Sequence, residues 1–287
     1  MKVIVLGASG MMGHQLIKKL IDENNSDSIV ALTRRKDLES KIGKSSIMRY
    51  LYLDNILEFN KLIKLFEDES PNLIINCVGV IKQRNQSDFM NTLSINAYFP
   101  KKLAQYTYKK DIRLIHISTD CIFSGLKGNY IETDLSDVTD LYGISKFVGE
   151  VDNNKSITIR TSMIGHELYS KKSLLEWFLY NKNQNIYGYN NAIFSGLTTN
   201  ELSKIIVKNI IPNKNLKGIY HVSSKPINKY DLLKLVAKIY KLKIDIKKDP
   251  RLVIDRSLNS EKFFKETGYI PPSWESMVEH MYLMNKI

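Results

Sequence analysis

The sequence predicts an α/β fold, with a doubly wound parallel sheet in the first part of the chain and a smaller C-terminal lobe. Short apolar runs alternate with amphipathic helical stretches over roughly the first 165 residues, as in a parallel sheet with crossover helices. A glycine-rich loop lies between the first apolar run and the first helical pattern. The alternation loosens after residue 165, which predicts domains at 1–165 and 166–287, with some later segments returning to the first domain.

The first element is an apolar, β-branched run at residues 2–6 (KVIVL), which is typical of a buried strand. Residues 11–21 follow with helical spacing of their apolar positions. Further strands are expected at 28–33, 47–53, 73–77, 112–117 and 156–160, with helical stretches between most of them. In the second part of the chain we expect helices at 174–180, 199–210 and 229–240 and a strand at 218–222.

The composition is that of an ordinary folded protein. Of 287 residues, 43% are hydrophobic and 25% are charged, with 14 Gly and 7 Pro, which excludes disordered, collagen-like and low-complexity chains. Two cysteines are too few for a disulfide framework or a four-ligand zinc site, and we expect no resident metal. The N-terminus lacks a signal-peptide pattern, and no apolar run approaches the roughly 20 residues of a membrane helix. The expected location is therefore the cytoplasm, with no membrane partner.

The charge balance is basic, with 42 Lys and Arg against 30 Asp and Glu, a net charge of +12. Such an excess is compatible with nucleic acid or with an anionic ligand. The lysines are scattered and form no dense block, so we expect most of them on a solvated surface and expect no nucleic-acid partner. A positive cleft for a phosphate-bearing ligand would account for the rest.

The loop GASGMMG has three glycines at three-residue spacing, directly after a strand pattern and directly before a helical one. The first glycine allows a tight turn, the second lets a pyrophosphate approach the backbone, and the third lets the helix pack closely on the strand. The N-terminus of the helix also attracts an anion. The arrangement predicts a Rossmann-type dinucleotide site formed by Gly7, Ser9, Gly10, Met11, Met12 and Gly13.

The end of the second expected strand indicates which nicotinamide cofactor binds. An acidic residue there would bind the adenosine ribose hydroxyls, but this chain has Thr33, Arg34 and Arg35 instead. Two guanidinium groups suit a 2′-phosphate, which favours NADP(H) over NAD(H). Asp54, at the end of the third strand, either accepts a hydrogen bond from the adenine amine or is a solvated strand-end residue.

Tyr142 and Lys146 are four residues apart at the start of an expected helix, which places them on one face. A tyrosine hydroxyl, with an ordinary pKa of about 10, exchanges a proton efficiently near neutral pH only if a cation stabilises its phenolate. Lys146 could supply that cation and also hold the nicotinamide ribose. Thr119 follows the strand at 112–117, where a hydroxyl can hydrogen-bond a substrate carbonyl.

Together these motifs resemble the extended short-chain dehydrogenase/reductase family. Within it, residues 117–125, 142–150 and 159–162 are most similar to dTDP-4-dehydrorhamnose reductases and related nucleotide-sugar 4-ketoreductases, with weaker likeness at Gly268 and Trp274. The resemblance implies that Cys77, Val78 and Gly79 form the turn behind the cofactor. It also implies that Asn96 matches an asparagine that the family often carries on the next helix.

The resemblance implies NADPH-dependent reduction of the 4-keto group of a nucleotide-linked 6-deoxyhexose, or of a UDP-linked N-acetylamino analogue, in surface polysaccharide precursor synthesis. The implied catalytic residues are Thr119, Tyr142 and Lys146, and the implied substrate contacts are Asp120, Cys121 and Arg256. Cys121 stands where an aromatic residue is common, Met163 stands where tryptophan is usual, and 255–257 diverges. The sugar, the nucleotide, any need for a divalent cation and the oligomeric state stay open, a homodimer being one option.

Three alternatives share the fold. A dehydratase would need a glutamate where Cys121 stands, and a thiol with an ordinary pKa near 8.5 is a poor replacement. An epimerase favours an acidic residue after the second strand, which Arg34 and Arg35 contradict. A non-catalytic NADP-binding regulatory subunit or sensor could keep the glycine loop but would not need Thr119, Tyr142 and Lys146.

Overall fold

The computed structural model describes residues 1–23, 26–81, 88–181 and 185–284. The chain divides into two compact units, each built from three segments. Unit 1 comprises residues 1–118, 139–159 and 203–219, and unit 2 comprises residues 119–138, 160–202 and 220–287.

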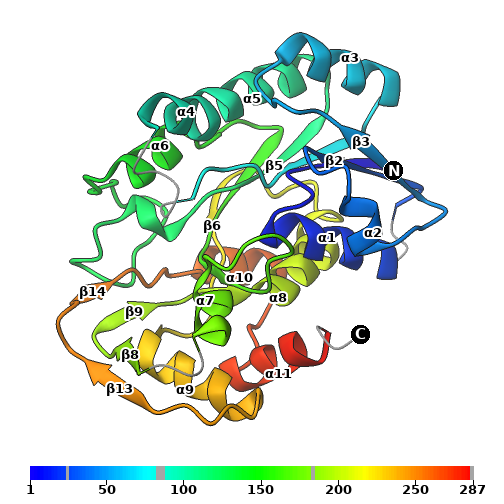
Figure 1. The fold of residues 1–287 in the computed structure, drawn as a ribbon. Coiled ribbons are helices and arrows are strands. Elements are labelled where there is room, and N and C mark those ends of the chain that lie inside the picture. Colours follow the sequence, from blue (N-terminus) through cyan, green and yellow to red (C-terminus); the bar gives the residue numbers. More distant parts are fainter. Residues whose placement is uncertain (24–25, 82–87, 182–184, 285–287) are drawn as a thin grey trace. The chain divides into compact units, whose positions relative to one another are not determined.

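Unit 1 is organised around a sheet with strand order β11-β6-β5-β4-β1-β2-β3, and the pairs from β6 to β3 are parallel (Figure 1). The predicted α/β fold with a parallel sheet is therefore confirmed, and each strand lies within one residue of its expected ends. The strands are β1 (Lys2–Leu6), β2 (Ser28–Thr33), β3 (Met48–Tyr52), β4 (Leu73–Asn76), β5 (Arg113–Ile117), β6 (Ser156–Arg160) and β11 (Gly218–His221), the last residues of β6 and β11 falling in unit 2.

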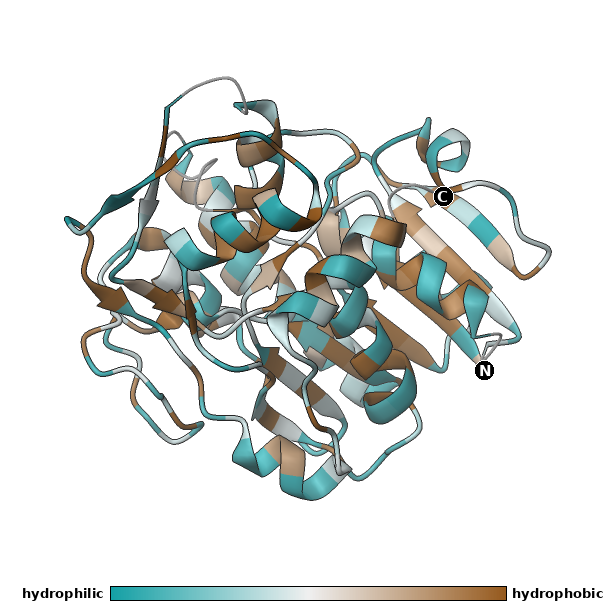
Figure 2. Ribbon diagram, turned by 90° about the horizontal axis from the view of Figure 1, so that it is seen from below, coloured by the Kyte–Doolittle hydropathy of each residue, from teal (hydrophilic) through white to brown (hydrophobic). Residues whose placement is uncertain are grey.

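Helices α3 and α5 cover one face of this sheet. Ile4 and Leu6 point to the same side of β1 and share a buried apolar cluster with Phe66 of α3 and Phe99 of α5. Figure 2 shows the apolar character of the strands and the mixed character of the helices around them. The helical elements of unit 1 are α1 (Met11–Asp22), α2 (Leu38–Ile42), α3 (Phe59–Glu69), α4 (Phe89–Leu93), the π-helical turn η2 (Ser94–Tyr98), α5 (Phe99–Lys109), α6 (Leu141–Gly149) and the π-helical turn η4 (Ile206–Ile210).

The strand order reverses between β1 and β4, which lie next to each other although β2 and β3 separate them in the sequence. In this register Leu6 lies beside Asn76, and Asn76 lies beside His116. Ligands of open parallel sheets bind outside the carboxyl ends of the strands at such a reversal. The loops that follow Leu6 and Asn76 are thus the expected binding loops.

The segment 203–219 belongs to unit 1 although it lies late in the sequence. The guanidinium group of Arg113, at the start of β5, donates hydrogen bonds to the carbonyl oxygens of Ile211 and Asn213, at 2.9 and 2.8 Å. The expected helix at 199–210 is present as α8 (Thr199–Ile205) continued by η4, so this helix begins in unit 2 and ends in unit 1.

The described residues of unit 2 form three small sheets, with strand pairings β10–β7, β12–β9–β14 and β13–β8. The helices expected at 174–180 and 229–240 are present as α7 and α9. None of the helices in the described ranges is both long and apolar enough to cross a membrane. The elements are the short helix η3 (Asp120–Ile122), β7 (Met163–Ile164), α7 (Leu174–Tyr180), β8 (Ile186–Tyr189), β9 (Ala192–Phe194), β10 (Leu197–Thr198), β12 (Ile227–Asn228), α9 (Lys229–Ile239), β13 (Ile246–Asp249), β14 (Ile254–Asp255), α10 (Glu261–Thr267) and α11 (Trp274–Met284).

Candidate cofactor and catalytic site

The glycine loop follows β1 and leads into α1 in unit 1. Gly7 has φ of +75°, and a Cβ on it would lie 3.0 Å from the carbonyl group of Cys77. A Cβ on Gly13 would overlap the carbonyl oxygen of Gly7. Gly10 precedes the helix and places no side chain over its first N–H groups. These glycines therefore leave an open backbone cradle at a helix N-terminus, which fits the pyrophosphate of a dinucleotide.

The second strand ends beside this loop, because the N–H of Ala8 donates to the carbonyl of Leu32 at 3.1 Å. Thr33 is buried and its hydroxyl accepts the N–H of Arg35 at 3.0 Å, which fixes the turn after β2. Arg34 and Arg35 are both exposed at the carboxyl end of that strand. Their guanidinium groups are therefore on the surface, where a phosphate could reach them.

Three other predicted cofactor residues in this loop, Ser9, Met11 and Met12, are buried to different degrees. Ser9 and Met11 are half-buried, whereas the side chain of Met12 is buried in the core. Asp54 is exposed just beyond β3. The backbone of the loop thus contributes more to the cradle than these side chains do.

The turn after β4 is fixed by amide side chains. Cys77 continues the sheet through its N–H, which donates to the carbonyl of Leu6 at 3.0 Å. The Asn76 side chain accepts the N–H of Val78 at 3.1 Å, and Gly79 is exposed. These bonds hold the turn in one conformation next to the glycine loop.

Asn96, in the π-helical turn η2, links this turn to helix α6. Its amide oxygen accepts the N–H of Val80 at 2.8 Å, and its amide nitrogen donates to the Val80 carbonyl at 3.0 Å. The same nitrogen donates to the Ser145 hydroxyl at 3.1 Å. Asn96 and Ser145 are fully buried, so this side chain positions neighbouring elements of the site.

Helix α6 carries Tyr142 and Lys146. It begins after Asp140, whose side chain accepts the N–H of Gly143 at 3.0 Å and so caps the helix. Tyr142 is half-buried and Lys146 is buried. The Lys146 ammonium donates to the carbonyl oxygen of Ile117, at the end of β5, at 2.7 Å.

Burial lowers the pKa of Lys146 to about 8, against an opposing effect of Glu150 and Cys77. Burial also raises the pKa of the Cys77 thiol to about 12, so this thiol is neutral near pH 7. Lys146 is thus a buried amine that gains or loses its charge within the pH range of an ordinary enzyme assay.

Thr119 begins the next segment of the chain, which belongs to unit 2. Its hydroxyl donates to the carboxylate of Asp120 at 3.2 Å and accepts the N–H of Cys121 at 3.1 Å. Burial raises the pKa of Asp120, opposed chiefly by the charge of Arg256. Burial likewise raises the pKa of the Cys121 thiol to about 12.

Arg256 belongs to another segment of unit 2, residues 220–287, and contacts the segment that begins at Thr119. Its guanidinium group donates to the carbonyl of Phe123 at 2.8 Å and to the Cys121 sulfur at 3.5 Å. The three predicted substrate residues of unit 2, Asp120, Cys121 and Arg256, therefore form one cluster. The predicted residues of unit 1 lie in the turns after β1, β2, β3 and β4 and on the helical elements α1, η2 and α6.

Sequence reasoning assigned no role to His116, Ser118 or Glu150, which are buried beside the predicted site of unit 1. The Asn76 amide nitrogen donates to Nδ1 of His116 at 3.1 Å, and the Ser118 hydroxyl donates to Glu150 at 2.7 Å. A histidine inside the apolar run at 112–117 was the one local signal of this polar network.

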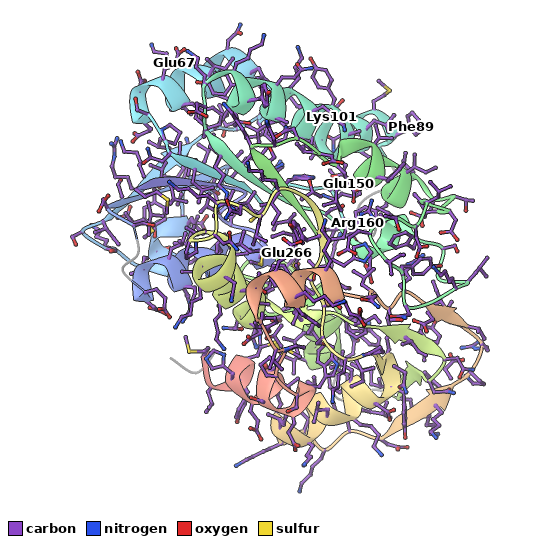
Figure 3. All side chains as sticks on the ribbon, turned by 180° about the vertical axis from the view of Figure 1, so that it is seen from behind. Glu67, Phe89, Lys101, Glu150, Arg160 and Glu266 are labelled. Carbon is purple, nitrogen blue, oxygen red and sulfur yellow. The ribbon has the colours of Figure 1, made fainter. Side chains whose placement is uncertain are left out.

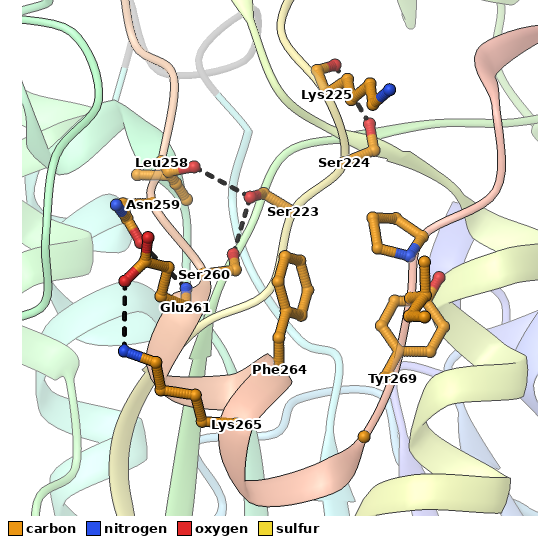
Figure 4. Close-up of a pocket in the computed structure, with 13 residues that line it drawn as sticks. Ser223, Ser224, Lys225, Leu258, Asn259, Ser260, Glu261, Phe264, Lys265 and Tyr269 are labelled. Atoms are coloured by element: carbon orange, nitrogen blue, oxygen red, sulfur yellow. Dashed lines mark hydrogen bonds and ion pairs between the residues drawn. The ribbon is translucent and has the colours of Figure 1, made fainter.

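A cavity of about 670 Å³ lies in unit 2 and is lined by residues 223–225, 258–261, 264–265 and 268–271 (Figure 4). At one side the Ser223 hydroxyl lies 2.6 Å from that of Ser260 and donates to the carbonyl of Leu258 at 2.9 Å. None of the predicted site residues lines this cavity. Within the described part of the chain, no group of three or more His, Cys, Asp or Glu residues is arranged to hold a metal ion.

Comparison with known proteins identifies the family. The model of the RmlD substrate binding domain matches residues 1–285. A dTDP-4-dehydrorhamnose reductase of Aggregatibacter actinomycetemcomitans is 26% identical over 242 residues, covering 80% of this chain and 76% of the relative. The methionine adenosyltransferase 2 subunit beta of Pongo abelii is 28% identical over 159 residues, covering 53% of this chain and 43% of that protein.

A solved structure shares the whole fold. The dTDP-4-dehydrorhamnose reductase of Bacillus anthracis in complex with NADP superposes with a TM-score of 0.78 at 20% identity, covering 99% of this chain and 98% of that one. The resemblance drawn from the sequence is confirmed. The chain belongs to the RmlD substrate binding domain family and is an oxidoreductase of the extended short-chain dehydrogenase/reductase type.

Proposed function

We propose that the chain uses NADPH to reduce the 4-keto group of a nucleotide-linked 6-deoxyhexose to the 4-hydroxy sugar. The observation that carries this proposal is the pair on α6, where Tyr142 lies one turn from a buried Lys146 that is held by the carbonyl of Ile117. A Tyr and Lys pair of this kind supports proton transfer to a carbonyl oxygen. The names of the relatives support the same reaction class.

The preference for NADPH rests on Arg34 and Arg35, which are exposed at the end of β2 with no acidic side chain before Asp37. Their positive charges suit a 2′-phosphate. The glycine cradle of Gly7, Gly10 and Gly13 would hold the pyrophosphate, and the turn at Cys77 to Gly79 would lie behind the nicotinamide. When bound, the cofactor supplies a hydride to the carbonyl carbon.

The side chains of the protein supply the proton that the reduction requires. Tyr142 donates its hydroxyl proton to the carbonyl oxygen as the hydride arrives at the carbon, so the product is a neutral alcohol. Lys146 stabilises the resulting phenolate and holds the ribose, and Thr119 donates a hydrogen bond to the carbonyl oxygen. Asp120, Cys121 and Arg256 contact the sugar nucleotide.

Dehydration is disfavoured by the state of Cys121. A dehydratase needs a base at this position, and burial raises the pKa of this thiol to about 12, so it does not ionise near pH 7. The match to a methionine adenosyltransferase subunit beta favours a second candidate, a non-catalytic NADPH-binding regulatory subunit. That candidate predicts NADPH binding without turnover.

The test is a panel of 4-keto-6-deoxyhexoses linked to dTDP, UDP or GDP, with the free sugar as control. We expect loss of NADPH absorbance with at least one nucleotide sugar and poor reduction of the free sugar, because the remote diphosphate helps to position the reacting carbonyl. With NADPH that carries deuterium at the transferable position, the label should appear on the carbon that bears the new hydroxyl. Inert nucleotide sugars together with rapid reduction of a small unphosphorylated ketone would overturn the proposed substrate.

A further inference from the structure

Glu150 directly follows the last residue of the catalytic helix α6, four residues after Lys146. Its side chain is 5% exposed, which is unusual for glutamate and calls for partners. One partner is the hydroxyl of Ser118, 95% or more buried, which donates to the Glu150 carboxylate at 2.7 Å. Glu150 therefore joins the end of α6 to the residue that directly precedes Thr119.

The backbone around Glu150 is also tied to its neighbours. Its N–H donates to the carbonyl of Phe147 at 3.1 Å, and its carbonyl accepts the ammonium group of Lys101 on α5. Figure 3 labels Lys101 and Glu150 in this part of unit 1. Gly149 lets the helix end come close, because a Cβ there would overlap the carbonyl oxygen of Asn96. Glu150 is thus tied through its side chain to the end of β5 and through its backbone to α6 and α5.

The same strand end receives Lys146. The carbonyl of Ile117 accepts the Lys146 ammonium group at 2.7 Å, one residue before the serine that binds Glu150. Two consecutive residues at the end of β5 are therefore bound by two side chains that are four residues apart in the sequence. These two hydrogen bonds hold the end of β5 against the C-terminal part of α6.

The titratable side chains near this site come from four elements, and most of them carry no negative charge near neutral pH. His116 on β5 is neutral, because burial, together with the positive charges of Lys146 and Lys101, lowers its pKa well below the ordinary value. Cys77 after β4 is neutral, because burial raises its pKa to about 12. Lys101 on α5 binds the backbone carbonyl of Glu150. Of the two side chains that raise the Lys146 pKa, Glu150 and Cys77, the Cys77 thiol is neutral, which leaves the Glu150 carboxylate as the source of negative charge.

We propose that Glu150 is a positioning residue for Lys146, which fixes the end of β5 against the catalytic helix and supplies the negative charge that keeps the buried amine protonated. This inference rests on the proposed role of Lys146 in the reduction. Its direct test needs no substrate, so the two proposals can fail separately.

The test is the titration of Lys146 followed by NMR of protein labelled with ¹³C in lysine, with the signal assigned by its absence in Lys146→Met. In the native protein we expect a midpoint near pH 8. Glu150→Gln keeps an oxygen that can accept the Ser118 hydroxyl but removes the charge, so the midpoint should fall by about one pH unit. An unchanged midpoint in a folded Glu150→Gln protein would overturn the proposal.

Two further variants separate charge from packing and keep the test decisive if Glu150→Gln does not fold. Ser118→Ala leaves the carboxylate in place, and the Lys146 midpoint should stay within a few tenths of a pH unit. Glu150→Asp keeps the charge on a shorter side chain, so the midpoint should fall by less than in Glu150→Gln. A midpoint in Glu150→Asp at or above the native value would contradict the proposal, and thermal melting verifies the fold of each variant.

Activity provides the second readout, provided that a substrate is found. If the Lys146 midpoint falls by one unit, Glu150→Gln should lose about fivefold in kcat/KM at pH 8 and almost nothing at pH 6, because the charged fraction changes only near the midpoint. Glu150→Asp should restore most of the native pH profile. A loss of equal size at both pH values would show a merely structural role and would overturn the proposal. If the Lys146 midpoint falls in Glu150→Gln but the native protein reduces none of the nucleotide sugars, the result contradicts the proposed function and not the role of Glu150.

Discussion

Removal of the Tyr142 hydroxyl group tests the proposed proton transfer to the substrate carbonyl. Tyr142→Phe keeps the ring on α6 and removes the proposed proton donor, so NADPH should bind almost as in the native protein. Turnover should fall by at least about a hundredfold, the effect usual for a lost general acid. NADPH affinity by fluorescence and turnover with the best nucleotide sugar would measure the two effects. The matched control is Tyr108→Phe, on the exposed side of α5, and near-native turnover of Tyr142→Phe would remove this residue from the mechanism.

Replacement of Arg34 and Arg35 tests the proposed preference for NADPH over NADH. Replacing both by Ala should weaken NADPH binding far more than NADH binding, because only NADPH carries the 2′-phosphate. Each lost charge-assisted contact is worth about 1.5–3 kcal/mol, or roughly ten- to a hundredfold in affinity. Calorimetric titration with both cofactors measures the difference.

A charge control for the arginine pair is available on the neighbouring helix α2 and just after it. The double variant Lys41→Ala with Lys44→Ala removes the same net charge from exposed positions and should leave the ratio of the two affinities unchanged. Equal weakening of both cofactors in the arginine variant, or a native preference for NADH, would show the arginine argument to be wrong.

At the scale of elements, the close approach of α6 to the π-helical turn η2 depends on Gly149. Alanine has a helix propensity about 1 kcal/mol better than glycine. The added Cβ would, however, overlap the backbone oxygen of Asn96, which is buried and cannot move without shifting η2. Because such overpacking costs about 1–3 kcal/mol, we expect Gly149→Ala to lower the free energy of unfolding.

Urea unfolding of three proteins measures the cost of this contact. Val148→Ala, on the exposed side of the same helix, should change the free energy of unfolding by no more than about 0.5 kcal/mol. If Gly149→Ala proves more stable than the native protein, helix propensity outweighs packing and the close contact is not limiting.

The elements of unit 1 could be predicted from the sequence because each buried strand is a short apolar run between polar turns. The glycine loop and the Tyr142 and Lys146 pair were equally visible, since their spacing alone places them on a loop and on a helix face. The strands of unit 2 were missed because elements of two to four residues are too short to show an alternation. The hydrogen bond from Lys146 to the carbonyl of Ile117 could not be predicted from the sequence. Every residue has a backbone carbonyl, so the identity of residue 117 does not indicate this bond.

For the whole molecule, buried histidines predict lower stability in acid. Burial lowers the pKa of His221 to about 3 and that of His116 well below the ordinary value. Below pH 6.5 the unfolded chain takes up protons that the folded chain does not, so stability falls as the pH drops from 6.5 towards 3. Each histidine should cost about 1 kcal/mol at pH 5.5 relative to pH 7.5.

Urea unfolding at the two pH values checks this expectation. His221→Gln should be less stable than the native protein at both pH values, because the bond of His221 to the Tyr130 carbonyl is lost, but its stability should depend less on pH. His280→Gln, at an exposed position of α11, is the control and should keep the native pH dependence. An identical pH dependence in His221→Gln and the native protein would rule out His221 as a source of acid sensitivity.

The alternation of the chain between its two units has a consequence for recombination. A single crossover near residue 165, where the sequence pattern changes, would separate Arg113 from the carbonyls of Ile211 and Asn213 that it binds. It would also leave residues 119–138 of unit 2 with the wrong parent. Because the proposed substrate residues Asp120, Cys121 and Arg256 lie in unit 2, we expect that transfer of substrate preference from a relative requires three inserted segments, at 119–138, 160–202 and 220–287, each joined at both of its boundaries or at the chain end. A library made by one-point shuffling should yield few folded chimeras, whereas one that exchanges these three segments together should retain NADPH binding.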